Sequence, residues 1–218
     1  MYHIAKEVPL IKKESIDKET SLYVWKCVEN IDKLRSLVAI DEEDLVKLNN
    51  FGNPNRKIHF LIVRIICHQL TGSSKIHYND EGKPFIASTN KHISISHSHD
   101  YVAVLLSANS NIGLDIQRKE EKIIRIRERF LNLQENQLID PNNIEQLTIL
   151  WCAKESIYKI HGDPTVFFKE HITIHSSSGF QSPHLTAELN HTLYSDIHHL
   201  KFEILENYVL VYTVFDSN

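Results

Sequence analysis

Two long segments set the expected architecture, and the first is Asn53-Pro-Asn-Arg-Lys-Ile-His-Phe-Leu-Ile-Val-Arg-Ile-Ile-Cys-His-Gln-Leu-Thr-Gly72. Apolar residues recur in it at steps of three and four, which is typical of a helix that buries one face. Asn53 suits a helix cap, Pro54 suits the first helical position, and Gly72 marks the end. The segment therefore predicts a long amphipathic helix.

A second long helix is predicted from near Pro141 to Gly162, because apolar residues again recur at helical spacing. Strand-like segments follow each long helix. The predicted strands lie at 22–28, 93–96, 101–106, 171–175, 185–189, 199–205 and 207–215. The two halves close on similar sequences, Tyr101-Val-Ala-Val and Tyr208-Val-Leu-Val.

This order of elements predicts an α+β fold made of a duplicated unit, with subdomains at residues 1–110 and 111–218. No low-complexity linker separates the halves, so we expect them to pack as one body with a cleft between them, where ligand sites are common. A short helix is expected to open at 41–44, and a charged helix is expected from Glu121 to about Leu131.

Composition narrows the class of protein. The 218 residues carry 24 basic and 28 acidic side chains, and a net charge of −4 argues against nucleic-acid binding. No apolar run approaches the roughly 18–20 residues that cross a bilayer. Three cysteines without a CxxC fit reduced thiols. We therefore expect a cytoplasmic protein with no nucleic-acid or membrane partner.

The second long helix carries a group of functional residue types, Trp151-Cys-Ala-Lys-Glu-Ser-Ile-Tyr-Lys159. Trp151, Glu155 and Lys159 lie one turn apart on one face. Glu155 and Lys159 are either an exposed ion pair or part of a half-buried site. In the second case the carboxylate needs a metal ion or another cation as partner.

An acidic residue also interrupts the apolar segment Ile112-Gly-Leu-Asp-Ile-Gln117. Asp115 is costly there unless it is paired or binds a metal, and the strand period places Gln117 on its side. The alternative is an Asp that hydrogen-bonds a turn. Gly113 allows another backbone or a ligand to come close. Asp115 and Glu155 together would suit Mg²⁺.

A third group combines Lys83 with the polar strand end Ile95-Ser-His-Ser98. Lysine, serine and histidine side chains are suited to hold a phosphate. A zinc pair of His97 and His99 is the weaker alternative, because no third ligand is positioned. A Ser96–His97 hydrolase dyad is disfavoured, since neighbouring strand residues point to opposite faces. The remaining histidines look scattered, and His198 and His199 are expected on the surface.

Four motifs occur in order: Gly-Lys-Pro (82–84), Ile-Ser-His-Ser (95–98), Gly-Leu-Asp (113–115) and Trp-x-x-Lys-Glu-Ser-x-x-Lys (151–159). With these motifs the sequence resembles the 4′-phosphopantetheinyl transferases. The likeness is to the larger single-chain, pseudodimeric type, similar to surfactin-synthetase-activating and holo-acyl-carrier-protein synthase-like members. The resemblance implies two subdomains about a pseudo-twofold axis, with the active site between them. It also implies transfer of 4′-phosphopantetheine from coenzyme A to a serine of an acyl or peptidyl carrier protein.

The resemblance further implies a role for each matching residue. Asp115 and Glu155 would bind Mg²⁺ at the pyrophosphate, and Glu155 would also deprotonate the carrier serine. The lysines expected at the pyrophosphate are Lys154 and Lys159, and the residues expected on the nucleotide phosphates are Arg64, Lys83, Ser96 and His97, with Arg64 at the 3′-phosphate.

Gln117 departs from the resemblance, because many members of the family have Glu at this position. Its amide oxygen can still bind Mg²⁺ directly or through a water, but the site has one negative charge fewer. We therefore expect weaker Mg²⁺ binding.

The segment from Arg118 to Arg129 has six basic and three acidic residues. It is either a solvated helix face or a surface that attracts an acidic carrier protein. Two rival functions stay open: a metal-dependent phosphodiester hydrolase, and an inactive homologue that binds coenzyme A or a carrier. An internal pseudodimer favours a monomer.

Overall fold

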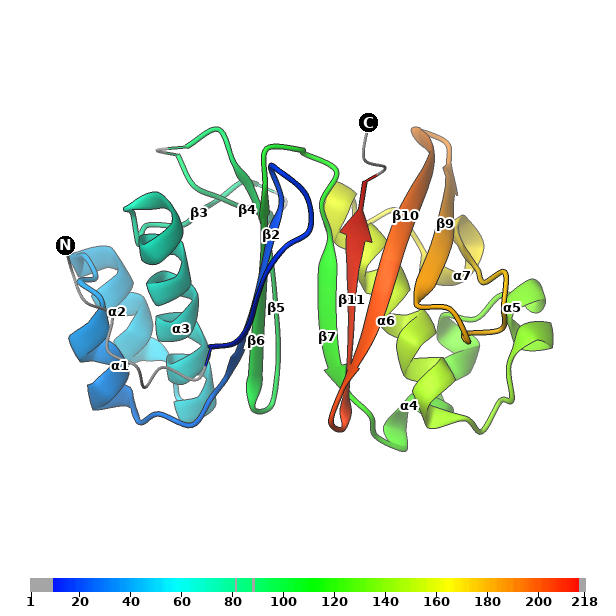
Figure 1. Cartoon of the computed structure of the whole chain (residues 1–218), viewed down its shortest axis with the longest axis horizontal. Helices are drawn as coiled ribbons and strands as arrows, with labels where there is room; N and C mark the ends of the chain where they lie inside the picture. The colour runs from blue at the N-terminus through cyan, green and yellow to red at the C-terminus, as the bar shows by residue number, and fades with distance from the viewer. Residues whose placement is uncertain (1–9, 81, 88, 216–218) are drawn as a thin grey trace.

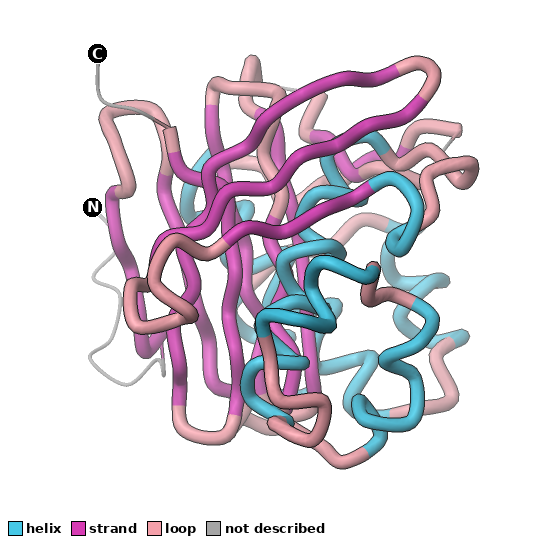
Figure 2. The backbone as a smooth tube through the Cα atoms, turned by 90° about the vertical axis from the view of Figure 1, so that its right-hand side faces the viewer, coloured by secondary structure: helices cyan, strands magenta, loops and turns pink. Residues whose placement is uncertain are grey.

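The computed structural model describes residues 10–80, 82–87 and 89–215. Two antiparallel sheets stand back to back in the middle of the molecule, and helices cover the outer face of each sheet (Figure 1). In Figure 2 the helices of the half that faces the viewer lie to one side of its long strands. The arrangement confirms the predicted α+β class with two similar halves.

The first half consists of sheet A, with strand order β1-β2-β6-β5-β4-β3, and three helices. Its strands are β1 (Leu10–Ser15), β2 (Ser21–Lys26), β3 (His77–Tyr78), β4 (Pro84–Phe85), β5 (His92–Ser98) and β6 (Tyr101–Ser107). Its helices are α1 (Ile31–Leu37), α2 (Glu42–Asn50) and α3 (Pro54–Thr71).

The second half consists of sheet B, with strand order β7-β11-β10-β9-β8, and its own helices. Its strands are β7 (Leu114–Arg118), β8 (Ile172–His175), β9 (His184–His191), β10 (Tyr194–Leu205) and β11 (Tyr208–Val214). Its helices are α4 (Lys122–Ile126), the 3₁₀ helix η1 (Arg127–Arg129), α5 (Leu133–Leu138), α6 (Ile144–His161) and α7 (Phe168–His171).

The long helices α3 and α6 have the same construction. Each has 18 residues and an asparagine cap, and each ends at a glycine in the left-handed region, Gly72 at φ 74° and Gly162 at φ 69°. Both ends of α3 and the Gly162 end of α6 are those that the sequence predicts, because caps and terminal glycines are local signals. Helix α6 begins at Ile144, shortly after Pro141, where its start is expected.

Apolar side chains from both sheets fill the space between them. Leu22, Val24 and Leu105 of sheet A pack with Leu114, Leu210 and Tyr212 of sheet B, and all are buried. Separate cores lie under α3 and α6. The halves are therefore joined through a continuous apolar layer.

Strands β5 and β7 are also joined by hydroxyl groups. The Ser94 hydroxyl accepts a hydrogen bond from the Leu114 amide at 3.0 Å, and the Ser98 hydroxyl accepts one from the Arg118 amide at 3.1 Å. Gly113 precedes β7, and a Cβ there would lie 1.8 Å from the backbone oxygen of Ser156 in α6. Of the two expected reasons for this glycine, the structure identifies the approach of another backbone.

The charged helix that we expect from Glu121 to about Leu131 is present but slightly shorter. It forms as α4, which continues directly into η1 and ends at Arg129, before the buried residues Phe130 and Leu131. Asn132 then starts α5 with a capping box that involves Glu135. Within the described part of the chain, every helix is too short or too polar to span a membrane.

Candidate active site

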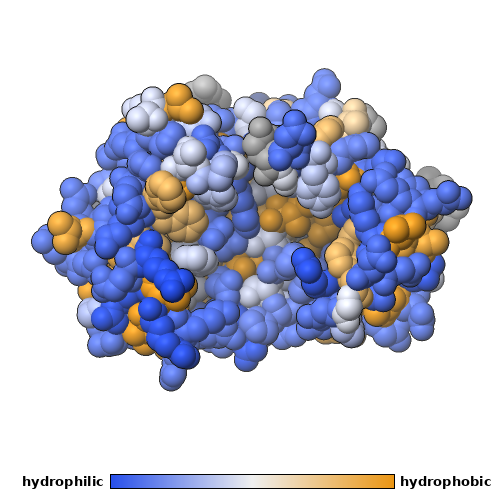
Figure 3. Space-filling view, turned by 180° about the vertical axis from the view of Figure 1, so that it is seen from behind, coloured by the Kyte–Doolittle hydropathy of each residue, from blue (hydrophilic) through white to orange (hydrophobic). Residues whose placement is uncertain are grey.

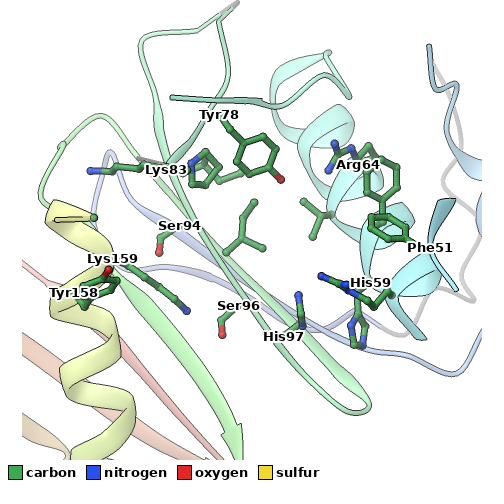
Figure 4. A pocket seen from close by; sticks show the side chains of 18 residues that line it. Phe51, His59, Arg64, Tyr78, Lys83, Ser94, Ser96, His97, Tyr158 and Lys159 are labelled. Carbon is green, nitrogen blue, oxygen red and sulfur yellow. The ribbon is translucent and has the colours of Figure 1, made fainter. Parts of the chain in front are cut away.

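A cavity of about 520 Å³ lies between the two halves. Most of its lining comes from α3, β4 and β5, while Tyr158, Lys159 and Gly162 enter from the end of α6. Its volume lies in the range of roughly 300–1,000 Å³ that is usual for small-molecule sites. Figure 4 shows the side chains that line it, and Figure 3 shows that the face turned away in Figure 1 is hollowed near its middle.

Asp115 is the centre of the polar contacts at one edge of this cavity. Its side chain is buried in β7, and Oδ1 accepts hydrogen bonds from Lys159 Nζ at 2.8 Å and Ser96 Oγ at 2.6 Å. Lys159 Nζ also donates to the Leu114 carbonyl at 3.0 Å. Figure 4 shows Lys159 extending toward Ser96. Asp115 is thus a paired buried carboxylate and not a turn cap.

Glu155 is half-buried one turn before Lys159 on the same face of α6. Burial and the nearby Asp115 carboxylate raise the pKa of Glu155 to about 7, although Lys159 acts in the opposite direction. Among the described residues, Lys159 forms its ion pair with Asp115 rather than with Glu155. The interpretation of Glu155 and Lys159 as a simple surface pair is therefore wrong.

Gln117 is two residues beyond Asp115 on β7 and half-buried, so it is on the same side of the strand. Its amide nitrogen makes only a long contact of 3.5 Å with the Arg118 carbonyl. The amide is therefore weakly held and available to a ligand.

Lys83 and His97 line the cavity from the first half. Lys83 Nζ donates to the carbonyl of Ile160 at 2.7 Å, and burial lowers the pKa of this lysine. The His97 ring is stacked on His59 at 4.6 Å between centroids. Burial and the neighbouring His59 lower the pKa of His97.

Arg64 also lines the cavity, but its guanidinium is bound by an acidic side chain of the first half. Its Nε and Nη2 donate to the carboxylate of Asp44 at 2.9 and 3.0 Å, and its side chain is only 2% exposed. The guanidinium lies 3.7 Å over the Phe60 ring. Much of the Arg64 charge is therefore neutralised by Asp44.

Arg56 is a cavity residue that the sequence analysis missed. It lies in the first turns of α3, is exposed, and has no ion pair among the residues that the structure describes. Its guanidinium lies 5.4 Å over the Phe51 ring, and its charge helps to lower the pKa of His97. Its spacing of three residues from His59 on a helix could have indicated it.

Lys154 is not brought to this site, and its expected catalytic role is corrected here. Its side chain is fully buried, and Nζ forms an ion pair with the buried Glu135 at 2.7 Å. Nζ also donates to the carbonyls of Phe168 and Ile172. The helix period turns position 154 away from Glu155 and Lys159, into the core of the second half. Lys154 therefore has a structural role, as the partner of a buried carboxylate.

The histidines are arranged differently from what the sequence predicts. His198 is buried with 8% exposure, so its expected surface position is wrong, whereas His199 is exposed. Among the described residues, His97 and His99 do not form a cluster that could bind a metal ion. The carbonyl of His99 instead contacts Nε2 of His59 at 2.7 Å.

The second half of the chain is similar to one family of known proteins. Residues 111–213 match the model of the 4′-phosphopantetheinyl transferase superfamily. The 4′-phosphopantetheinyl transferase gsp of Aneurinibacillus migulanus is 36% identical over 90 residues, which are 38% of this chain and 36% of that protein. The 4′-phosphopantetheinyl transferase AcpT of Escherichia coli O157:H7 is 30% identical over 110 residues, which are 45% of this chain and 54% of that protein.

A further relative, from Synechocystis sp., is 24% identical over 157 residues, which are 64% of each chain. The matches thus span between about a third and two thirds of these relatives' lengths. The resemblance drawn from the four motifs is confirmed.

Proposed function

Since residues 111–213 carry a domain of the 4′-phosphopantetheinyl transferase superfamily, we propose that the chain moves 4′-phosphopantetheine from coenzyme A to a carrier-protein serine. The products are a holo acyl or peptidyl carrier protein and 3′,5′-ADP. The observation that carries the proposal is the meeting of Asp115, Glu155 and Lys159 beside a cavity lined by cationic side chains.

The reaction needs a base that accepts the serine proton and cations that neutralise the negative charge of the phosphates. The serine oxygen attacks the phosphorus that bears the pantetheine arm, and the bond from this phosphorus to the bridging oxygen of 3′,5′-ADP breaks. Glu155 takes the serine proton, directly or through a water, as a general base. Lys159 stabilises the negative charge that develops on the leaving side.

The carboxylates also fit Mg²⁺. Burial and the neighbouring Asp115 carboxylate raise the pKa of Glu155, so a bound cation would stabilise its charged form. We propose Asp115 and Glu155 as ligands, with Gln117 contributing its amide oxygen or holding a bound water. When bound, the ion neutralises pyrophosphate charge.

The test is to incubate the protein with coenzyme A, Mg²⁺ and an apo carrier protein, and then to weigh the carrier. A mass gain of one phosphopantetheine group supports the proposal. Release of free phosphopantetheine without a carrier would identify a hydrolase. Binding of coenzyme A or the carrier without turnover would identify an inactive homologue.

We propose that the basic segment 118–129 attracts the acidic carrier. Lys119, Lys122 and Arg127 are paired with nearby glutamates. Arg125 and Arg129 have no ion pair among the described residues, so their charge is available to a partner. We further propose a cytoplasmic monomer, since Cys27, Cys67 and Cys152 are free and the two halves already enclose the cavity.

We expect Gln117→Glu to lower the Mg²⁺ concentration that gives half-maximal transfer, because it adds a charged oxygen ligand. The measurement is a titration of activity with Mg²⁺. Gln134→Glu is the matched control, since it adds the same charge on an exposed position of α5, near the opposite edge of sheet B. An unchanged half-saturation point would place Gln117 outside the metal site.

The 3′-phosphate of coenzyme A is expected to lie near Arg56 and His97. Arg56→Ala and His97→Ala should each weaken coenzyme A about 10–150-fold, which corresponds to losing one charge-assisted hydrogen bond of about 1.5–3 kcal/mol. Binding of dephospho-coenzyme A should barely change. Kd values for both ligands form a double cycle.

Equal weakening of both ligands by each variant would mean that the contact is not with the 3′-phosphate. Arg64 remains a predicted contact, but Arg64→Ala is a poor probe. It would leave Asp44 buried without its partner.

A further inference from the structure

Three side chains with metal-binding atoms meet where the end of α6 approaches the start of β10. They are His161, the last residue of α6, and Asp196 and His198 of β10. One ligand atom from each lies within 4.8 Å of the others. Figure 1 shows the C-terminal end of α6 and the beginning of β10 at the same upper end of the second half.

The two imidazoles have unused nitrogen atoms. Nε2 of His161 and Nε2 of His198 are both shielded from solvent, and neither has a hydrogen-bond partner among the described residues. His198 is only 8% exposed. Buried polar atoms normally have partners, so two unpaired nitrogens beside one carboxylate indicate a missing ligand.

A simple ion pair does not account for this group. Asp196 Oδ2 lies 4.0 Å from Nε2 of His161, which is longer than a hydrogen bond. Burial lowers the pKa of both histidines, and Lys83 lowers the pKa of His161 further. The Asp196 carboxylate acts in the opposite direction on both, but burial has the larger effect. The imidazoles are therefore neutral near pH 7, the form that ligates metals.

We propose that His161, Asp196 and His198 bind one divalent cation of the zinc class through two imidazole nitrogens and one carboxylate oxygen. Imidazole favours Zn²⁺ over Mg²⁺, which prefers oxygen ligands. This site is separate from Asp115 and Glu155 and does not depend on the proposed transfer activity.

The geometry can close around such an ion. Zinc bonds of about 2.0–2.1 Å in a tetrahedron place ligand atoms about 3.3 Å apart. Asp196 is half-exposed, with 48% of its side chain accessible, and can rotate inward. Three protein ligands leave a fourth position for water. The bound ion would fix the end of α6, the helix that carries Glu155 and Lys159, against β10.

The test is a zinc titration of the whole chain by competition with a chromophoric chelator, in excess Mg²⁺ so that the Asp115–Glu155 carboxylates do not compete. We expect one Zn²⁺ per chain. His161→Gln and His198→Gln should each weaken binding by at least ~10²-fold, more than the loss of an outer-shell partner costs. His199→Gln is the matched control on the exposed face of β10 and should bind as the unmodified chain does.

Thermal unfolding gives an independent measurement, because a ligand that binds only the folded state raises the Tm. Zn²⁺ should raise the Tm of the unmodified chain and of His199→Gln, but not that of His198→Gln. Asp196→Asn, at an exposed position, serves as a second variant if His198→Gln does not fold. Absence of stoichiometric zinc, or equal binding by His198→Gln and His199→Gln, would overturn the proposal. Neither outcome would affect the transfer assay.

Discussion

Glu155→Gln should lower the rate of phosphopantetheine transfer by at least ~10²-fold at saturating Mg²⁺, which is the lower range for losing a general base. Glutamine cannot accept the serine proton, and it also removes one negative ligand of the metal. The measurement is the initial rate of holo-carrier formation.

Glu145→Gln is the matched control for this prediction. It makes the same chemical change on the first turn of α6, where Glu145 forms an ion pair with Lys119. We expect its rate to stay close to that of the unmodified protein. Near-normal turnover by Glu155→Gln would remove Glu155 from the mechanism.

Lys154→Met should lower the free energy of unfolding by about 3–5 kcal/mol, because it leaves the fully buried carboxylate of Glu135 without its cation. Urea denaturation followed by circular dichroism measures this change. The double variant Lys154→Met, Glu135→Gln should recover part of the loss, since no buried charge then remains unpaired.

The folded Lys154→Met protein should transfer phosphopantetheine at nearly the normal rate at a temperature below its Tm. Lys154 does not line the cavity, and its amino group is satisfied by Glu135 and by two backbone carbonyls. A rate loss of ~10²-fold in a folded protein would return Lys154 to the active site.

The motifs were informative about the site because they combine residue type with local spacing. Glu155 and Lys159 are four residues apart on one helix, and Asp115 is an acid in an apolar strand. Both facts can be read without a structure. The structure adds that Lys159 forms its ion pair with Asp115, which lies 44 positions away in the sequence. Helix and strand periodicity cannot predict this pairing, because the two residues lie on different elements.

The arginines and histidines show the same limit. A helix pattern identifies Arg64 as part of α3, but its partner Asp44 belongs to α2. Arg56 lies three residues before His59 on the same helix, but that spacing alone does not show that its guanidinium faces the cavity. The burial of His198 depends on how α6 and β10 pack, because both faces of an isolated strand are equally exposed.

The sequence by itself determined both ends of α3, the Gly162 end of α6, the strand-rich character of both halves and the resemblance to a transferase family. Caps, glycines, periodicity and ordered motifs are local properties of the chain. Only the tertiary structure decided which charged side chains form buried structural ion pairs and which face the cavity. Lys154 joins Glu135 and Arg64 joins Asp44, while Lys159 reaches the site. The physical reason is that an ion pair forms between groups that packing brings within a few ångströms, however far apart they lie in the sequence.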